Sequence, residues 1–158
     1  MPAENGALPH EICMAAVRAV AALPGVSALV RSRWYSSAAV PPSQQGRFVN
    51  GAVRVRTSLA PAVLLAALHG LEAVAGRTLA SRRQAGPNAA RTLDLDIIDF
   101  AGLVHAAINP ILPHLRAHQR AFVLLPLRDV APSWRHPVTG QTVQALLDAL
   151  PPQDIHPL

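Results

Sequence analysis

Lysine is absent from this chain, since all fourteen basic residues are arginine, and aromatic residues make up only 4% of it. The net charge of +5 suggests an anionic partner. Nucleic-acid-binding surfaces, however, combine dense basic stretches with aromatic side chains that stack on bases, and both are scarce here. A lysine-free chain rich in alanine, proline and arginine is also typical of a GC-rich coding sequence. We therefore expect no nucleic-acid partner.

Cysteine and long hydrophobic runs are also scarce. The single cysteine, Cys13, excludes an internal disulfide and a cysteine-rich zinc site. The apolar stretch over residues 12–30 is interrupted by Arg18 and Pro24, whereas a membrane helix needs about 20 consecutive apolar residues. Acids precede this stretch, whereas a signal peptide begins with basic residues. We expect a soluble cytoplasmic protein without a membrane partner.

The length of 158 residues fits one domain that spans 1–158. Apolar spacing predicts a helix over 10–23, which Pro24-Gly25 ends. Alternating apolar residues predict strands over 27–36 and 48–57. Residues 40–46 have the composition of an exposed loop.

The second half continues the alternation of helices and strands. Ser58 is expected to cap a helix that carries Pro61 in its first turn and ends before Gly76. A strand is predicted over 91–100, and Thr142 is expected to cap a last small helix. Residues 151–158 are expected to form a frayed tail. The order helix, strand, strand, helix, strand indicates an α+β sandwich with an antiparallel sheet. It is a ferredoxin-like βαββαβ core whose first strand is missing.

The predicted strand over 91–100 concentrates acids in an acid-poor chain, at Asp94, Asp96 and Asp99. Side chains two apart in a strand share a face, so Asp94 and Asp96 lie side by side while Leu93, Leu95 and Ile97 pack inward. Two adjacent carboxylates repel unless they are solvated, protonated or bound to a metal. Magnesium is typically held by one or two carboxylates with water and phosphate oxygens. An ordinary exposed strand face is the alternative interpretation.

The run Arg91-Thr92-Leu93-Asp94-Leu95-Asp96-Ile97-Ile98 resembles the signature of the hydroxymethyldihydropterin pyrophosphokinases. Three other segments agree with this family in the expected order, and the resemblance covers about residues 32–150. These segments are Phe48-Val49-Asn50-Gly51-Ala52-Val53 with Thr57-Ser58-Leu59, Leu71-Glu72 with Gly76-Arg77, and Leu112-Pro113-His114 with Arg120-Ala121-Phe122-Val123-Leu124.

The resemblance implies an enzyme of folate biosynthesis that transfers diphosphate from ATP to the hydroxymethyl group of 6-hydroxymethyl-7,8-dihydropterin and releases AMP. It implies two Mg2+ ions held by Asp94 and Asp96, with Arg91 and Arg82 also acting in catalysis. The partners are then two small molecules, and we expect a monomer. The implied ATP-binding residues are Glu72, Arg77, Arg91, Ile97, His114 and Arg120. The implied pterin-binding residues are Ser37, Val40, Phe48, Asn50 and Phe122.

The chain departs from the family at its beginning. Family members open with a central strand that ends in Gly-Ser-Asn or Gly-Ala-Asn, and this chain has no counterpart. We expect the neighbouring strands to lack a partner, and we favour a misplaced start as the cause. Two alternative functions therefore stay open. One is a shortened, non-catalytic homologue that binds pterin or nucleotide, and the other is a different Mg-dependent nucleotide-using transferase.

Overall fold

The computed structural model describes residues 8–38, 46–76 and 93–158. The helices and strands are α1 (Pro9–Ala21), β1 (Val26–Arg31), β2 (Tyr35–Ser37), β3 (Phe48–Asn50), β4 (Val53–Thr57), α2 (Pro61–Val74), the 3-10 turn η1 (Ala117–Gln119), α4 (Ala121–Val130), α5 (Val143–Ala149) and β5 (Ile155–Pro157). In the described residues no helix is long and apolar enough to cross a membrane.

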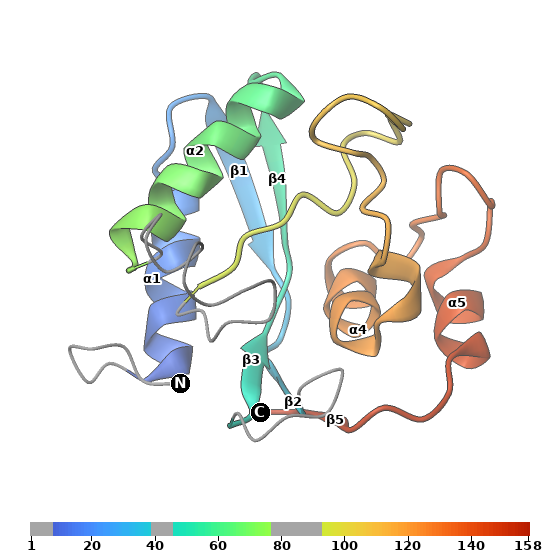
Figure 1. Cartoon of the computed structure of the whole chain (residues 1–158). Coiled ribbons are helices and arrows are strands. Elements are labelled where there is room, and N and C mark those ends of the chain that lie inside the picture. The colour runs from blue at the N-terminus through green and yellow to red at the C-terminus, as the bar shows by residue number, and fades with distance from the viewer. Residues whose placement is uncertain (1–7, 39–45, 77–92) are drawn as a thin grey trace.

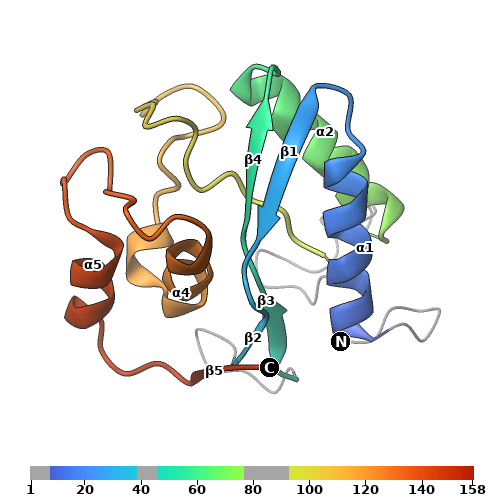
Figure 2. The same ribbon diagram turned by 180° about the vertical axis from the view of Figure 1, so that it is seen from behind.

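The antiparallel pair β1–β4 lies between two helical layers. Helices α1 and α2 cover one side of the pair, and α4 and α5 lie on the other, as Figure 1 and the reverse view in Figure 2 show. One core, under α1 and α2, includes Val20, Leu64 and Leu68. A second core joins α4 to α5 through Leu124 and Leu146. The predicted α+β class with helices packed on an antiparallel sheet is confirmed.

Helices α1 and α2 begin without a side-chain cap of their own N-cap residue. The prediction that Ser58 caps α2 is wrong. The N-cap residue of α2 is Ala60, and Pro61 occupies the first helical position. Proline suits this position because its fixed φ matches the helix and its missing N–H would have no helical partner. Gly76 follows α2 with φ at +104°, a conformation that favours glycine.

Each of the two long strands predicted over 27–36 and 48–57 is divided in the structure. The Ser32 N–H donates to the Ala52 carbonyl, and the Ala52 N–H donates to the Ser32 hydroxyl. The Trp34 ring lies so close to Gly51 that a Cβ there would come within 2.4 Å of a ring carbon. These contacts interrupt the regular ladder, and a uniform alternation of residue types does not reveal such an interruption. The outer parts, β2 and β3, consequently form a separate sheet.

The C-terminal segment forms the third strand of that separate sheet, whose order is β3-β2-β5. Strand β5 pairs antiparallel with β2, so the expectation of a frayed tail is wrong. The chain crosses from α5 to β2 along the lower edge of the molecule in Figure 1. Tail residues such as Pro151 and Pro152 carry no local strand signal, so the pairing depends on the edge that β2 offers.

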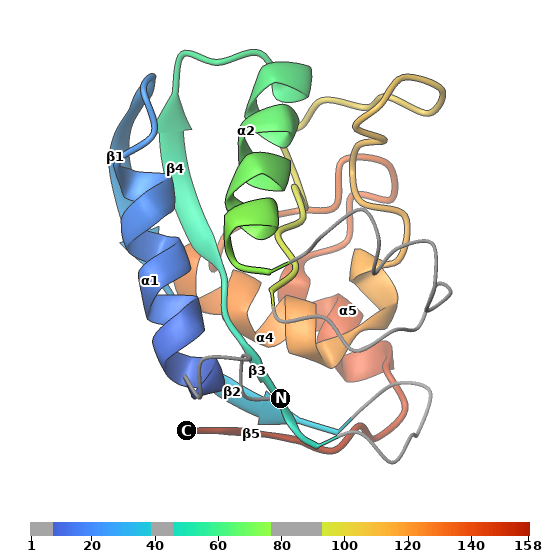
Figure 3. The same cartoon turned by 60° about the vertical axis from the view of Figure 1, so that its left-hand side comes forward.

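Residues 93–99 are extended but form no strand in the described part of the chain. Their predicted alternation of buried and exposed side chains is nevertheless present, with Leu93 and Ile97 buried. The segment runs alongside α2, on the open side of β4, in Figure 3. Among the described strands β4 pairs only with β1. Without an adjacent ladder the segment cannot meet the hydrogen-bond criterion of a strand.

Candidate active site

Asp94 and Asp96 project from the same side of the extended segment. Both are exposed, while Leu93 and Ile97 on the opposite side are 8% and 9% exposed. Ile97 belongs to the core under α2, and Leu95 packs against that core. Burial of the apolar side thus orients the carboxylates toward solvent, as the alternation predicts.

His114 lies next to this carboxylate side. Its backbone N–H donates to the Ile98 carbonyl at 2.9 Å, which fixes the loop against the aspartate segment. Its Nδ1 accepts a hydrogen bond from the Arg116 N–H at 3.3 Å. In a neutral imidazole the proton then lies on Nε2, and Nε2 is 4.0 Å from the Asp96 carboxylate. The structure therefore brings together two of the predicted site residues, Asp96 and His114.

A cavity of about 270 Å3 opens beside Asp96. Its lining is mixed, with apolar side chains and a few polar groups, as in sites for small molecules. The lining residues are Leu65, His69, Asp96, Ile97, Asn109, Pro110, Ile111, His114 and Leu115. Three predicted site residues thus line one cavity. The sequence did not indicate that the loop over 109–115 forms its other wall.

Glu72 is buried beneath the aspartate segment, with 1% of its surface exposed. Its Oε1 accepts a hydrogen bond from the Leu95 N–H at 2.8 Å. A carboxylate that accepts a hydrogen bond from a backbone N–H takes the place of the carbonyl acceptor that a neighbouring strand would otherwise supply. Glu72 therefore holds the backbone between Asp94 and Asp96, and its implied contact with ATP stays a prediction.

The predicted pterin residues Ser37, Phe48 and Asn50 come together where β2 pairs with β3. Ser37 lies opposite Phe48 in the ladder. The Asn50 amide donates to the Ser37 hydroxyl at 2.9 Å and to the Phe48 carbonyl at 3.3 Å. Phe48 and Asn50 are two residues apart and share one side of β3. Phe48 and Asn50 are partly buried, and Ser37 is fully buried, with 4% of its surface exposed.

Arg120 and Phe122 lie at the beginning of α4, which contacts both β2 and β3. The Arg120 guanidinium carbon is 5.4 Å from the centre of the Phe122 ring. A cation over an aromatic face is attracted by the negative charge density of that face. One residue predicted for the pterin and one predicted for ATP therefore occupy the same helical turn.

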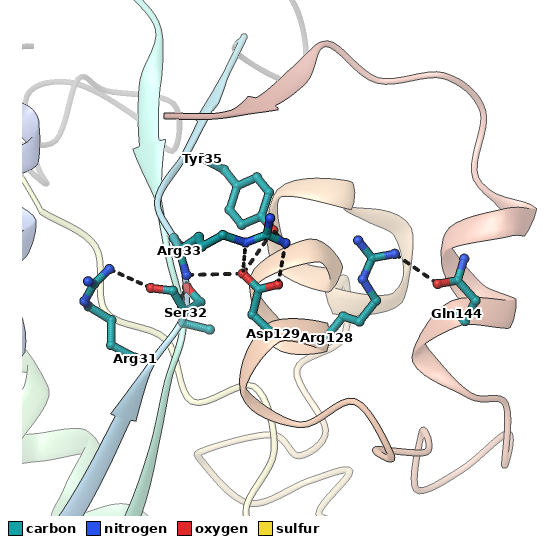
Figure 4. A network of polar contacts seen from close by, with 8 residues as sticks. Arg31, Ser32, Arg33, Tyr35, Arg128, Asp129 and Gln144 are labelled. Atoms are coloured by element: carbon teal, nitrogen blue, oxygen red, sulfur yellow. Dashed lines mark hydrogen bonds and ion pairs between the residues drawn. The ribbon is translucent and has the colours of Figure 1, made fainter.

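A polar network that the sequence did not reveal fixes α4 to β2 (Figure 4). Arg33 binds both carboxylate oxygens of Asp129 at 3.2 and 2.9 Å, and the Tyr35 hydroxyl donates to Asp129 at 3.0 Å. The hydrogen bonds from Arg33 hold the pKa of the Asp129 carboxyl below its ordinary value. Burial and the neighbouring Asp129 carboxylate raise the pKa of Tyr35. Because Asp129 is far from Arg33 and Tyr35 in sequence, no local motif indicates the network.

Four of the predicted site residues lie outside the described residues. They are Val40, Arg77, Arg82 and Arg91.

Comparison with known proteins agrees with the motif and the fold. Residues 5–132 match the model of the family described as 7,8-dihydro-6-hydroxymethylpterin-pyrophosphokinase. Three similar proteins are each named 2-amino-4-hydroxy-6-hydroxymethyldihydropteridine pyrophosphokinase. The protein from Pseudomonas aeruginosa is 40% identical over 98% of this chain and 91% of its own length. Those from Synechocystis and Methylorubrum extorquens are each 35% identical, over 84% and 89% of this chain and 65% and 84% of their own lengths.

The family match spans most of the chain, and it includes the aspartate segment, the cavity wall and the beginning of α4. The chain belongs to the 7,8-dihydro-6-hydroxymethylpterin-pyrophosphokinase family.

Proposed function

We propose that this chain transfers the terminal diphosphate of ATP to the hydroxymethyl group of 6-hydroxymethyl-7,8-dihydropterin and releases AMP, with the side of the chain that carries Asp94 and Asp96 as the reaction centre. The observation that carries the proposal is the exposure of both carboxylates from a segment whose other side is buried, beside the cavity that Asp96 and His114 line. This arrangement suits a reaction that depends mainly on positioning and charge neutralisation.

Asp94 and Asp96 would hold the Mg2+ ions. The described residues include no group of three or more His, Cys, Asp or Glu side chains that could enclose a metal. Two carboxylates are sufficient for Mg2+, because water and substrate phosphate oxygens complete its octahedron. The bound cations would neutralise the negative charge of the triphosphate and align it. This charge neutralisation requires the exposure that both aspartates have.

ATP would enter the cavity beside Asp96. The apolar lining residues Ile97 and Ile111 offer surface for the flat base, and His114 offers an N–H on Nε2. Arg120 would contact phosphate oxygens, for which the planar guanidinium is well suited. Its position over Phe122 limits the orientations that its side chain adopts.

The pterin would lie between Phe48 and Phe122. A flat heterocycle is held by aromatic surfaces above and below it and by a group that both donates and accepts hydrogen bonds. The Asn50 amide is such a group, and its contact with Ser37 orients it. α4 packs against β2 and β3, so the helix and the small sheet form opposite sides of this site.

The test is an assay of AMP release with ATP, Mg2+ and the reduced pterin. The expected products are AMP and the pterin diphosphate in equal amounts. Release of pyrophosphate or a nucleoside diphosphate would instead indicate the different nucleotide-using transferase. Pterin binding in calorimetry, together with no AMP release in the assay, would indicate a non-catalytic homologue. Either of these results contradicts the proposal.

A further inference from the structure

The C-terminal segment over 151–158 contacts both sides of the site proposed for the pterin. It leaves α5, passes the beginning of α4 and then pairs with β2 (Figures 1 and 2). Hydrogen bonds extend this pairing past both ends of β5, from the Ala38 N–H to the Asp154 carbonyl and from the Leu158 N–H to the Trp34 carbonyl. The match to the family's model ends at residue 132, so that match says nothing about this segment.

Gln153 binds the backbone on the α4 side. Its Oε1 accepts from the Ala121 N–H at 2.9 Å, and its Nε2 donates to the Gln119 carbonyl at 3.1 Å. Helix α4 has no hydrogen bond from the side chain of its own N-cap residue, Arg120. A helix leaves its first N–H groups without partners inside the helix. Gln153 therefore supplies the cap from 32 residues further along the chain, at the turn that carries Arg120 and Phe122.

Asp154, the next residue, binds the opposite side. Its carboxylate accepts two hydrogen bonds from the Arg47 guanidinium, at 2.7 and 3.0 Å. The same guanidinium donates to the Ser36 hydroxyl at 2.7 Å and to the Ser36 carbonyl at 3.2 Å. Arg47 and Ser36 directly precede Phe48 and Ser37 in the chain. Asp154 thus connects β2 to β3 next to two of the residues proposed for the pterin.

We propose that the C-terminal segment is a positioning element for catalysis, in which Gln153 sets the first turn of α4 for both substrates and Asp154 sets the β2–β3 side for the pterin alone. The proposal rests on the proposed function. Two consecutive residues contact the two sides of one site, so a shift of this segment changes the separation between Phe122 and Phe48. Small displacements of positioning groups have large effects on phosphoryl-type transfer.

Gln153→Ala, Asp154→Ala and the unaltered chain are compared by calorimetry with the reduced pterin and a non-hydrolysable ATP analogue, with Mg2+ present. Gln153→Ala is expected to raise the Kd of both ligands about fivefold, the factor that corresponds to a typical cap contribution. Asp154→Ala is expected to raise the Kd of the pterin and to leave that of the ATP analogue unchanged. Gln141→Ala, at an exposed glutamine on the α5 side, is the matched control and should change neither.

A graded variant separates positioning from folding. Gln153→Glu retains the acceptor for the Ala121 N–H but loses the donor to the Gln119 carbonyl, so its effect on both ligands should be smaller than that of Gln153→Ala. If Gln153→Ala does not fold, the Kd values of Gln153→Glu for the pterin and the ATP analogue test the positioning role instead.

Variants that unfold at lower temperature but keep both Kd values would overturn the positioning role, as would an equal effect of Asp154→Ala on both ligands. If the unaltered chain binds neither ligand, the proposed function fails and this inference fails with it. Unchanged affinities in variants of a chain that does bind overturn the inference alone.

Discussion

The aspartate segment over 93–99 and the C-terminal segment over 151–158 are held in opposite ways. The first carries the most specific motif of the chain, yet its backbone forms no strand in the described residues and relies on a side chain, Glu72, for the Leu95 N–H. The second carries no motif, yet its backbone pairs regularly with β2. A motif therefore indicates which chemistry a segment presents, whereas the backbone pairing of that segment depends on the edge beside it.

The largest effect is expected from removal of the motif carboxylates. Asp94→Ala and Asp96→Ala should each lower the rate of AMP release by at least about a hundredfold, because a charge-neutralising contact in phosphoryl-type transfer is lost. Both residues are exposed, so thermal unfolding should change little. Asp148→Ala is the control, since Asp148 is an exposed acid on α5 whose carboxylate accepts a hydrogen bond from Gln144. A similar loss of rate in the control would contradict the assignment.

Removal of the support beneath the motif should affect stability. Glu72→Ala leaves the Leu95 N–H without its acceptor in a buried place, at a cost of about 1–3 kcal/mol in the free energy of unfolding. Glu72→Gln keeps a carbonyl acceptor and should lose less. Chemical denaturation of both variants gives the two values. An equal loss would mean that the charge, rather than the hydrogen bond to Leu95, is the stabilising feature.

In the network that fixes α4 to β2, Asp129→Asn should lower the free energy of unfolding by about 2 kcal/mol at pH 7, because the charge-assisted hydrogen bonds from Arg33 are weakened. The folded pKa of Asp129 lies below its unfolded value near 3.8. Its contribution is therefore complete above that pH and is lost as pH falls through the folded pKa. The difference in the free energy of unfolding between the two proteins should accordingly shrink as pH falls below 3.8. A constant difference across this range would contradict the ion pair.

The smallest effect is expected at His136, which lies in neither segment and is 6% exposed. Burial, with a smaller effect of the neighbouring His118, lowers the pKa of His136 below 6.5. The unfolded chain then binds more protons than the folded one, so stability should fall as pH drops below 6.5, by at most about 1.4 kcal/mol per pH unit. His136→Asn keeps a side-chain acceptor near the Val138 N–H and should flatten this part of the pH profile. If the dependence of stability on pH is the same in the variant, His136 is not its cause.

Much of the first half could be predicted because its signals are local. The helix α1 and the position of Pro61 in α2 follow from apolar spacing and from the fixed φ of proline. The predicted cap of the last helix is confirmed too, since the Thr142 hydroxyl accepts from the Ala145 N–H. The division of the two long strands could not be predicted, because it depends on contacts of Trp34 with Gly51 and of Ser32 with Ala52, which are distant in sequence.

The candidate site likewise has features that the sequence predicts and features that depend on the tertiary structure. Alternation placed Asp94 and Asp96 on one side of their segment, and the structure agrees. The hydrogen bond from the Leu95 N–H to Glu72 and the cap of α4 by Gln153 could not be predicted from the sequence. Both are long-range hydrogen bonds that join residues more than twenty positions apart, and no local pattern encodes such pairs.

The motif around Asp94 and Asp96 is local, so the order of residues alone identifies the family and predicts that these two carboxylates are exposed together. Only the tertiary structure decided how the segments are held. A backbone N–H or carbonyl group pairs with whichever group the fold places beside it. The Leu95 N–H therefore donates to the buried Glu72 carboxylate, and the C-terminal segment pairs with the edge of β2.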